Sequence, residues 1–271
     1  NMQFFHLITL EWKKFHKNTV MILLMGLFTF LMPFAIFVME NYKSVPPMPE
    51  KDTFFTFPGI WEYQGYSASW FSFLFLGFIG VLLITTEVGN RTLRQNIITG
   101  LTRMEYFLGK LYVILLISLY ATLIYFVSTL LIGSFYPETF AMADFMNGHD
   151  WSTGRYFLLT FGYLSFGLFL GYILRKTGLA IFVYLSYIIF LEPLLRWAVH
   201  IKIFNNASMH YYPMNAMEDL MPNPLFKFAE NFTSMTDFNI LLSYRDASIV
   251  AVISIALFLL IGLRSLLRRD I

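Results

Sequence analysis

The stretch of sequence that decides the fold is residues 87–110, which read EVGNRTLRQNIITGLTRMEYFLGK. Long apolar runs lie on both sides, so this stretch is a polar island between two hydrophobic segments. Residues 92–98 have the composition of a short helix, and Gly100 is placed to end it. The island has four basic residues and lacks the Gly- and Ser-rich composition of a flexible linker. We expect an ordered surface on which another protein can push.

The second half of the island contains a helix start signal. Thr102 precedes Glu105 by three residues, which is the spacing of a capping box. In that motif the Thr hydroxyl accepts from the backbone N–H of Glu105, and the Glu105 carboxylate reaches back to the backbone of Thr102. The pattern predicts a long helix that begins at Arg103. A short helix, a turn and a capped helix together form a unit rigid enough to transmit motion.

Composition places most of the chain in lipid. The 271 residues are 57% hydrophobic and only 13% charged, whereas a soluble domain has about 25% charged residues. A bilayer core of about 30 Å requires about 20 apolar residues in a helix, because backbone polar groups in lipid must be satisfied within the segment. The sequence therefore predicts an all-α integral membrane protein, a single transmembrane domain over residues 1–271. Its six expected membrane helices are residues 19–39, 66–86, 111–135, 156–174, 178–199 and 247–263.

The distribution of charge predicts the orientation. One set of connecting segments, which includes both termini and the island, carries 12 of the 19 basic residues and 4 of the 17 acidic ones. Basic residues are retained on the cytoplasmic side of membranes. We therefore expect both termini and residues 87–110 to be cytoplasmic, in a multi-pass protein of the cell membrane, or of the inner membrane in a bacterium.

Two further segments have distinct character. Residues 1–18 mix apolar and basic side chains, which is typical of an amphipathic helix at the cytoplasmic interface; the alternative is an extended start of the first membrane helix. Residues 200–246 form a long extracytoplasmic loop rich in aromatic residues. We expect short helices there, packed on the outer ends of the membrane helices.

The island resembles the cytoplasmic coupling region of type-2 permeases of ATP-binding-cassette (ABC) exporters. The resemblance rests on the residues that occupy the family's positions, which are Glu87, Gly89, Thr92-Leu93-Arg94, Thr102-Arg103 and Gly109-Lys110. The six-helix topology and the long final outer loop agree with it, so it extends over nearly the whole chain. The sequence departs from the pattern at Gly100-Leu101, where many members have Pro before the Ser/Thr-Arg step.

The resemblance implies a permease subunit that pairs with a second permease, identical or a sibling, and with separate ABC ATPase subunits. The chain has no phosphate-binding loop of the G-x-x-x-x-G-K-[S/T] type, so ATP and Mg²⁺ would be bound by the partner and no cofactor by this chain. The short helix would enter a groove of the ATPase. Its expected contacts are polar at Arg91, Arg94 and Gln95 and apolar at Leu93 and Ile97, and Glu87, Thr92 and Arg103 complete the coupling region. The alternative is that the basic residues only bind anionic lipid.

The resemblance also implies that the second and fifth membrane helices line a substrate path. The residues expected there are Trp70, Phe71, Phe73, Tyr184 and Tyr187. An aromatic lining favours an amphipathic or lipid-like substrate, and the alternative is lipid or core contact. The pair Gly167 and Gly171 is a small-x-x-x-small pattern, which we expect to pack within the subunit.

Glu192 and Arg196 are four residues apart and share a helix face near the outer end of the fifth membrane helix. They suggest an outer gate, a structural ion pair bent by Pro193, or an intramembrane protease. The protease interpretation is weak, because none of the five histidines lies within a membrane-helix core.

The outer loop also contains a cluster of Met and His residues, Met209, His210, Met214, Met217 and Met221. Thioether and imidazole groups suit Cu(I), so a metal-handling permease is an alternative. Methionine is also common packing material, and we assign no metal site.

Three classes of function remain open at this stage. The first is an ABC exporter permease. The second is a non-transporting membrane anchor that transmits ATPase motion to an extracytoplasmic protein. The third is an ion-coupled transporter, which predicts ionisable groups at mid-membrane. Membrane lipids are expected contacts in every case, and nucleic acid in none.

Overall fold

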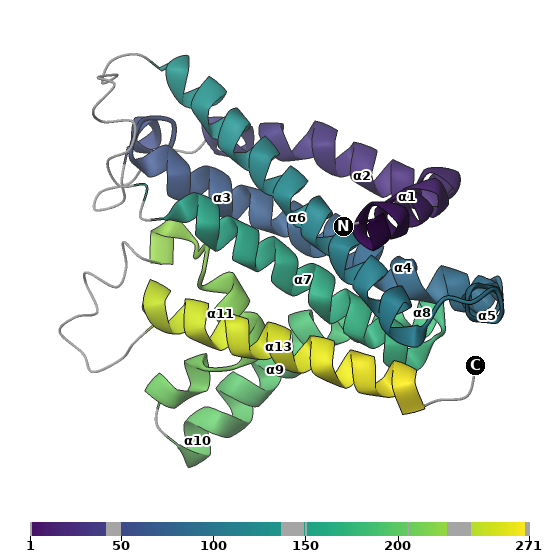
Figure 1. The fold of residues 1–271 in the computed structure, drawn as a ribbon. Coiled ribbons are helices and arrows are strands. Elements are labelled where there is room, and N and C mark those ends of the chain that lie inside the picture. Colours follow the sequence, from purple (N-terminus) through teal and green to yellow (C-terminus); the bar gives the residue numbers. More distant parts are fainter. Residues whose placement is uncertain are drawn as a thin grey trace.

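The computed structural model describes residues 2–41, 50–136, 149, 151–204, 206–226 and 240–268, and all regular elements within these ranges are helical. Figure 1 shows an elongated bundle of long helices, with α5 and the C-terminal end of α13 toward the right. The predicted all-α fold is confirmed. Parts of the loops at 40–65, 136–155 and 200–246 lie outside the described residues.

Six helices in the described ranges are long and apolar enough to cross a membrane, as predicted. Several are composites of α-helix with tighter or wider turns. In chain order they are α2 (Thr19–Leu31) continued by η1 (Met32–Asn41); α3 (Gly59–Phe71), η3 (Ser72–Leu76) and α4 (Gly77–Gly89); α6 (Arg103–Ser134); α7 (Ser152–Leu174); α8 (Thr177–Ser186), η5 (Tyr187–Leu191), α9 (Glu192–Leu194), η6 (Leu195–His200) and α10 (Ile201–Ile203); and α13 (Tyr244–Arg268).

Local signals in the sequence explain where these helices start. Asn18 caps α2 by accepting from the backbone N–H groups of Val20 and Met21. The capping box at Thr102 and Glu105 is present, and α6 begins at Arg103 as predicted. Before α2, the amphipathic segment forms helix α1 (Met2–Lys17), which ends with basic residues in its last turn. A short turn at Asn18 separates α1 from the first membrane helix.

Helix α7 forms the centre of the bundle and packs against α4, α6 and α13. Two of its glycines allow α4 to approach closely. A Cβ added at Gly167 would lie 2.4 Å from the carbonyl oxygen of Gly77, and one at Gly171 would lie 3.1 Å from that of Val81. On the other side of this contact, a Cβ at Gly80 would lie 2.5 Å from the carbonyl oxygen of Leu164. The predicted packing of the Gly167–Gly171 pair within the subunit is therefore confirmed.

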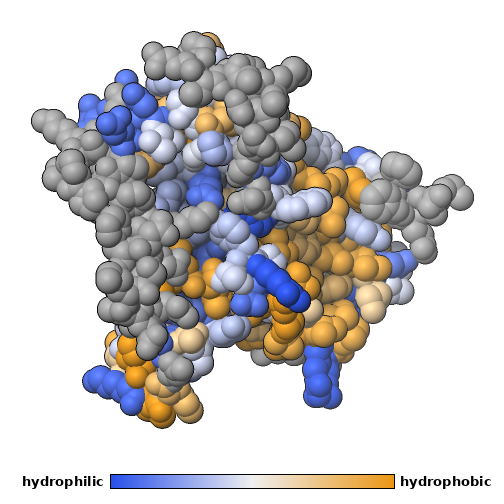
Figure 2. Space-filling model, turned by 90° about the vertical axis from the view of Figure 1, so that its left-hand side faces the viewer, coloured by the Kyte–Doolittle hydropathy of each residue, from blue (hydrophilic) through white to orange (hydrophobic). Residues whose placement is uncertain are grey.

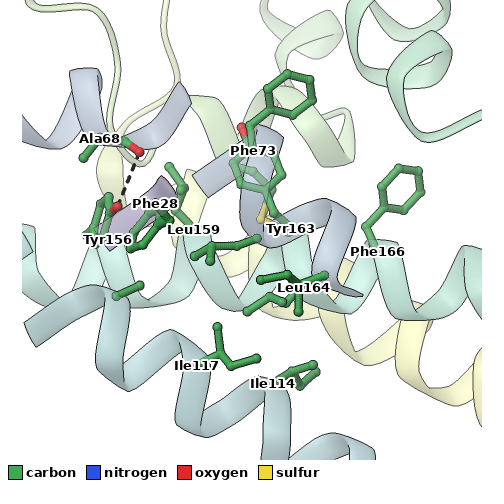
Figure 3. Close-up of a cluster of buried hydrophobic side chains, with 14 of the residues drawn as sticks. Phe28, Ala68, Phe73, Ile114, Ile117, Tyr156, Leu159, Tyr163, Leu164 and Phe166 are labelled. Carbon is green, nitrogen blue, oxygen red and sulfur yellow. Dashed lines mark hydrogen bonds between the residues drawn. The ribbon is translucent and has the colours of Figure 1, made fainter. Parts of the chain in front are cut away.

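Aromatic and aliphatic side chains from α2, α3, α6 and α7 form a hydrophobic core between these helices. Figure 3 shows part of this cluster. Tyr156 stacks on Tyr125 with ring centroids 4.5 Å apart. Its hydroxyl lies 2.7 Å from the hydroxyl of Ser72 and 3.4 Å from the carbonyl oxygen of Ala68, which accepts from it. Such partners offset the cost of burying the phenol hydroxyl.

The described part of the outer loop packs into the bundle. It contains η7 (Ala207–His210) and α11 (Pro213–Glu218), and α11 contacts α7 and α13. The sulfur of Met217 fills the space that a Cβ on Gly162 would need, at 2.3 Å. Gly162 lies ten residues into α7, a depth of about 15 Å along that helix at about 1.5 Å per residue. The expectation of short packed helices is thus confirmed for the described residues, and the loop reaches deeper than expected.

Candidate coupling surface and outer pocket

The short helix of the island, α5 (Thr92–Ile98), has the predicted bounds. Arg91 precedes it with a left-handed backbone (φ 58°), and Gly100 follows it at φ 107°, a conformation that favours glycine. These two turns set α5 between the ends of α4 and α6. The hydroxyl of Thr92 donates to the carbonyl oxygen of Glu87 (3.2 Å), which ties α5 to the last turn of α4.

One residue of α5 is buried although it was predicted to lie on the exposed face. Leu93 was expected to contact an ATPase, but its side chain is buried within the protein and belongs to the core. The apolar side chain that α5 exposes is Ile98, which is 74% exposed and was not singled out from the sequence. Arg94 and Gln95 are exposed as expected, whereas Ile97 is half-buried. Because α5 lies against α4, the side of the helix that carries Leu93 is turned inward.

A buried ionic cluster lies behind α5. Lys110, near the start of α6, is almost fully buried and donates to Glu11 of α1 (2.5 Å) and to Glu87 of α4. Lys14 of α1 lies 2.6 Å from Glu11 and 3.3 Å from Glu87, so two lysines face two glutamates. The amide nitrogen of Asn96 on α5 lies 3.4 Å from the carboxylate of Glu87. Four helices that are separate in sequence therefore meet at Glu87.

Helices α1 and α6 lie in contact at the Gly109-Lys110 step. A Cβ at Gly109 would lie 3.4 Å from the Cγ of Glu11, which is an ordinary van der Waals contact. Burial by itself raises the pKa of Glu11, but the charges of Lys110 and Lys14 outweigh burial and hold its pKa below the ordinary value. Glu11 is therefore ionised at neutral pH, and α1 is bound to the bundle through charge.

Arg103, which was predicted to complete the coupling region, contacts the end of α13. Its guanidinium donates to the carbonyl oxygens of Leu266 (3.0 Å) and Leu267 (2.6 Å), in the last turns of α13. The last carbonyls of a helix have no partner within the helix, so a cation there satisfies them. Arg103 thus fastens the start of α6 to the end of α13.

At the opposite end of the bundle, a pocket of about 450 Å³ lies between the second and fifth membrane helices and the outer loop. Figure 2 looks onto this end, where hydrophilic residues lie among broad hydrophobic surface. Two of the predicted path residues, Trp70 and Phe73, line the pocket. We call it the outer pocket, because the charge distribution predicts that this end faces outward.

The other predicted path residues lie elsewhere. Tyr184 is fully buried, stacks on Phe73 with centroids 5.7 Å apart and donates to the carbonyl oxygen of Phe73 (2.9 Å). Tyr184 is therefore part of the contact between α8 and η3. Phe71 stacks on Phe75, and Tyr187 lies beside Phe166 of α7.

Glu192 and Arg196 do not pair with each other, and both hold the outer loop. The carboxylate of Glu192 accepts from the backbone N–H groups of Met214 (3.1 Å) and Asn215 (2.6 Å), at the start of α11. The guanidinium of Arg196 donates to the carbonyl oxygen of Met209 (3.0 Å) and, at 3.1 Å, to Nδ1 of His210. The expected ion pair is absent because each group finds a partner in the loop, which the spacing of four residues does not reveal.

The methionines of the outer loop serve as packing. Met209, Met214, Met217 and Met221 are all buried, and the sulfur of Met221 packs on Gly65 of α3 while that of Met217 packs on Gly162 of α7. These two thioethers therefore lie against different helices. Among the described residues, no group of three or more His, Asp or Glu side chains is arranged to hold a metal ion.

Glu218, at the end of α11, lies in the outer pocket. Glu218 is exposed, yet desolvation by the surrounding protein raises its pKa to about 7. The charges of Glu192 and Asp219 raise this pKa further, and Arg196 opposes them. Glu218 was not predicted as a site residue. Its position after Met217 resembles any loop carboxylate, so the sequence contains no signal that would have identified it.

Comparison with known protein families identifies a match over most of the chain. A family model described as ABC-2 family transporter protein matches residues 7–191, which include α1 from Leu7 onward, the ionic cluster, α5 and the first half of the fifth membrane helix. No curated protein matches the chain.

Proposed function

The chain belongs to the ABC-2 family of transporter proteins, and from this premise we propose that it is the permease of an exporter that moves an amphipathic substrate. It is a multi-pass membrane protein and the transmembrane subunit of such a transporter, without an ATPase domain of its own. Proteins of this family work with ATPase subunits. In our proposal two permease chains pair, and the exposed face of α5 docks into a groove of each ATPase.

The observation that carries the proposal is the way α5 is mounted. Arg94, Gln95 and Ile98 point away from the protein, while Leu93, Thr92 and Asn96 fasten the helix to its neighbours. A combination of arginine with an apolar side chain is typical of protein interfaces. A force applied to this face would act on α4 directly through Thr92.

The ionic cluster supplies the next step of the proposed mechanism. Glu87 contacts Asn96 on α5, Lys110 on α6 and Lys14 on α1, so a displacement of α5 would move the ends of α1, α4 and α6 together. Rigid elements joined by well-packed polar contacts carry such motion, whereas a flexible loop would absorb it. Closure of the ATPase pair around ATP would then rock the second membrane helix, which borders the outer pocket.

Two features support transport rather than a role as a membrane anchor. The described part of the outer loop is packed within the bundle through Met217 and Met221 and does not project as a separate binding module. The outer pocket lies between the second and fifth membrane helices, where the substrate path was expected. The fifth membrane helix is the least buried of the six, with 22% of an 18-residue window buried within the subunit against 28% for the first and sixth, so it offers exposed surface for a second permease.

Co-purification tests the proposal. The chain is co-expressed with each candidate ABC ATPase of its source organism, and the amount of ATPase retained on the tagged permease in mild detergent is measured. Arg94→Glu combined with Ile98→Asp should reduce the retained ATPase at least about tenfold, because both changes place carboxylates in the proposed interface. Leu93 is left intact, since a change there would disturb the core as well as the surface.

Lys13→Glu is the matched control. Lys13 is an exposed residue of α1 with the same charge, and it makes none of the cluster's contacts. Its replacement should leave ATPase retention unchanged. If the Arg94 and Ile98 variant retains as much ATPase as the unchanged protein, or if no candidate ATPase is retained at all, the proposal fails.

A further inference from the structure

The outer pocket has the dimensions and composition of a ligand site. Its volume of about 450 Å³ falls within the range of about 300–1,000 Å³ that is usual for small-molecule pockets. The second membrane helix contributes Tyr66 and Trp70, the fifth contributes Ile188 and Trp197, and the outer loop contributes Glu218. Such sites combine apolar walls with a few convergent polar groups.

The aromatic walls of the pocket are partly exposed. Trp70 is 57% exposed and Trp197 is 47% exposed. The guanidinium of Arg196 lies over the ring of Trp197, 6.0 Å from its centroid. The ring of Trp70 lies nearly perpendicular to those of Tyr66 and Phe73, with ring centroids 6.4 Å apart in each pair and interplanar angles of 84° and 83°. An indole held in this way has a fixed orientation, and its face attracts a cation through the ring quadrupole.

The charged side chains of the pocket differ in whether they already have hydrogen-bond partners within the protein. The guanidinium of Arg196 is committed to Met209 and His210 of the outer loop. The carboxylate of Asp219 accepts from the side chain of Asn215 (2.9 Å) and the backbone N–H of Leu242 (3.0 Å). The carboxylate of Glu218 makes no hydrogen bond and no salt bridge within the described part of the chain, and its backbone carbonyl oxygen accepts from the N–H of Met221 (3.0 Å). It is the carboxylate available to a ligand.

We propose that the outer pocket binds a hydrophobic cation, with the positive charge against Glu218 and the apolar part on Trp70 and Trp197. When Glu218 is ionised, Glu218 and Asp219 against Arg196 leave one excess negative charge at the pocket, which favours a cation over an anion of the same shape. This inference rests on the proposed function in one respect, since it names the chemical class of the exported substrate as an amphipathic cation. Binding itself requires no ATPase.

The test uses the purified full chain in lipid nanodiscs without ATPase, with radiolabelled tetraphenylphosphonium as the probe. Tetraphenylborate has nearly the same shape and the opposite charge, and empty nanodiscs correct for partition into lipid. The cation should bind saturably and the anion should not. Glu218→Gln should weaken cation binding about tenfold, because it removes the charge and keeps the side-chain volume.

Two further variants keep the test decisive. Trp70→Leu should also weaken cation binding, even if Glu218→Gln proves difficult to purify. Glu50→Gln removes an exposed carboxylate outside the pocket and should leave binding unchanged. Equal binding of the two ions, or unchanged cation binding in both pocket variants, overturns the inference.

The outcomes also separate this inference from the proposed function. Glu218 lies at the end of the bundle opposite α5, so Glu218→Gln should retain the ATPase in the co-purification experiment. Loss of cation binding with full ATPase retention supports both proposals. Absence of cation binding in the unchanged protein refutes the pocket assignment alone, and absence of ATPase retention refutes the proposed function alone.

Discussion

The ionic cluster behind α5 yields a prediction whose size follows from its geometry. Lys110 is almost fully buried and touches Glu11 and Glu87, which are themselves buried. Lys110→Met keeps a side chain of similar length but leaves both carboxylates with Lys14, which is partly exposed. Removal of one partner from a buried ion pair costs about 3–5 kcal/mol, because the remaining charge stays out of water. Since Lys14 still contacts both carboxylates, we expect a loss near the lower end, about 3 kcal/mol.

The assay is unfolding of the purified protein by SDS in mixed micelles, followed by tryptophan fluorescence. Lys13→Met removes an exposed lysine of α1 and should change the free energy of unfolding by no more than about 0.5 kcal/mol. A second change, Glu87→Gln in the Lys110→Met background, removes one of the stranded carboxylates. It should restore a large part of the loss, because a neutral amide costs less to bury than a charge.

Two results would refute the reasoning. A loss below about 1 kcal/mol for Lys110→Met would mean that the cluster resembles an exposed salt bridge. Additive effects of Lys110→Met and Glu87→Gln would mean that the two residues do not interact, since residues in contact show coupling energies of about 0.5–3 kcal/mol.

Two further predictions concern the helix core and the outer pocket. Gly167→Ala should lower the free energy of unfolding by about 1–3 kcal/mol in the same assay, because its Cβ would lie 2.4 Å from a backbone oxygen of Gly77; Gly26→Ala, which meets nothing within 4 Å, is the control and should be tolerated. Cation binding in the outer pocket should strengthen as the pH rises through about 7, because Glu218 has its pKa raised to about 7 and binds the cation in its ionised form. Titration of binding from acidic to alkaline pH checks this, and an unchanged pH profile in Glu218→Gln would contradict it.

The helical elements could be read from the sequence because their signals are local. The bounds of α5, the start of α6 at Arg103 and the six membrane helices follow from the hydrophobic runs, from Gly100 and from the capping box at Thr102. Each signal acts over a few residues or over one helix length. The close packing of α7 on α4 through Gly167 was also predictable, because a pair of small residues on one face has few other uses in a membrane helix.

The candidate sites could be predicted only in part. Arg94 and Gln95, which were predicted to contact the ATPase, are exposed on α5, and Trp70 and Phe73, predicted for the substrate path, line a pocket. Both roles stay predictions. Leu93 was assigned to the wrong side, because seven residues are too few for an apolar stripe to define which face is buried. Tyr184 is an aromatic residue of the kind expected to line a path, but its hydroxyl donates to the carbonyl oxygen of Phe73, which is the contact of a core residue.

The sequence by itself determined the class of the protein, its six membrane helices and the short helix between the second and third of them, because length and hydrophobicity decide which segments enter a bilayer. Only the tertiary structure decided which polar groups meet. Lys110 and Glu11 form an ion pair although they are 99 residues apart in sequence. Glu192 and Arg196 do not contact each other; each hydrogen-bonds instead to the outer loop, which enters the bundle. A buried charge must find a partner somewhere in the fold, but which partner depends on helix packing that no single segment encodes.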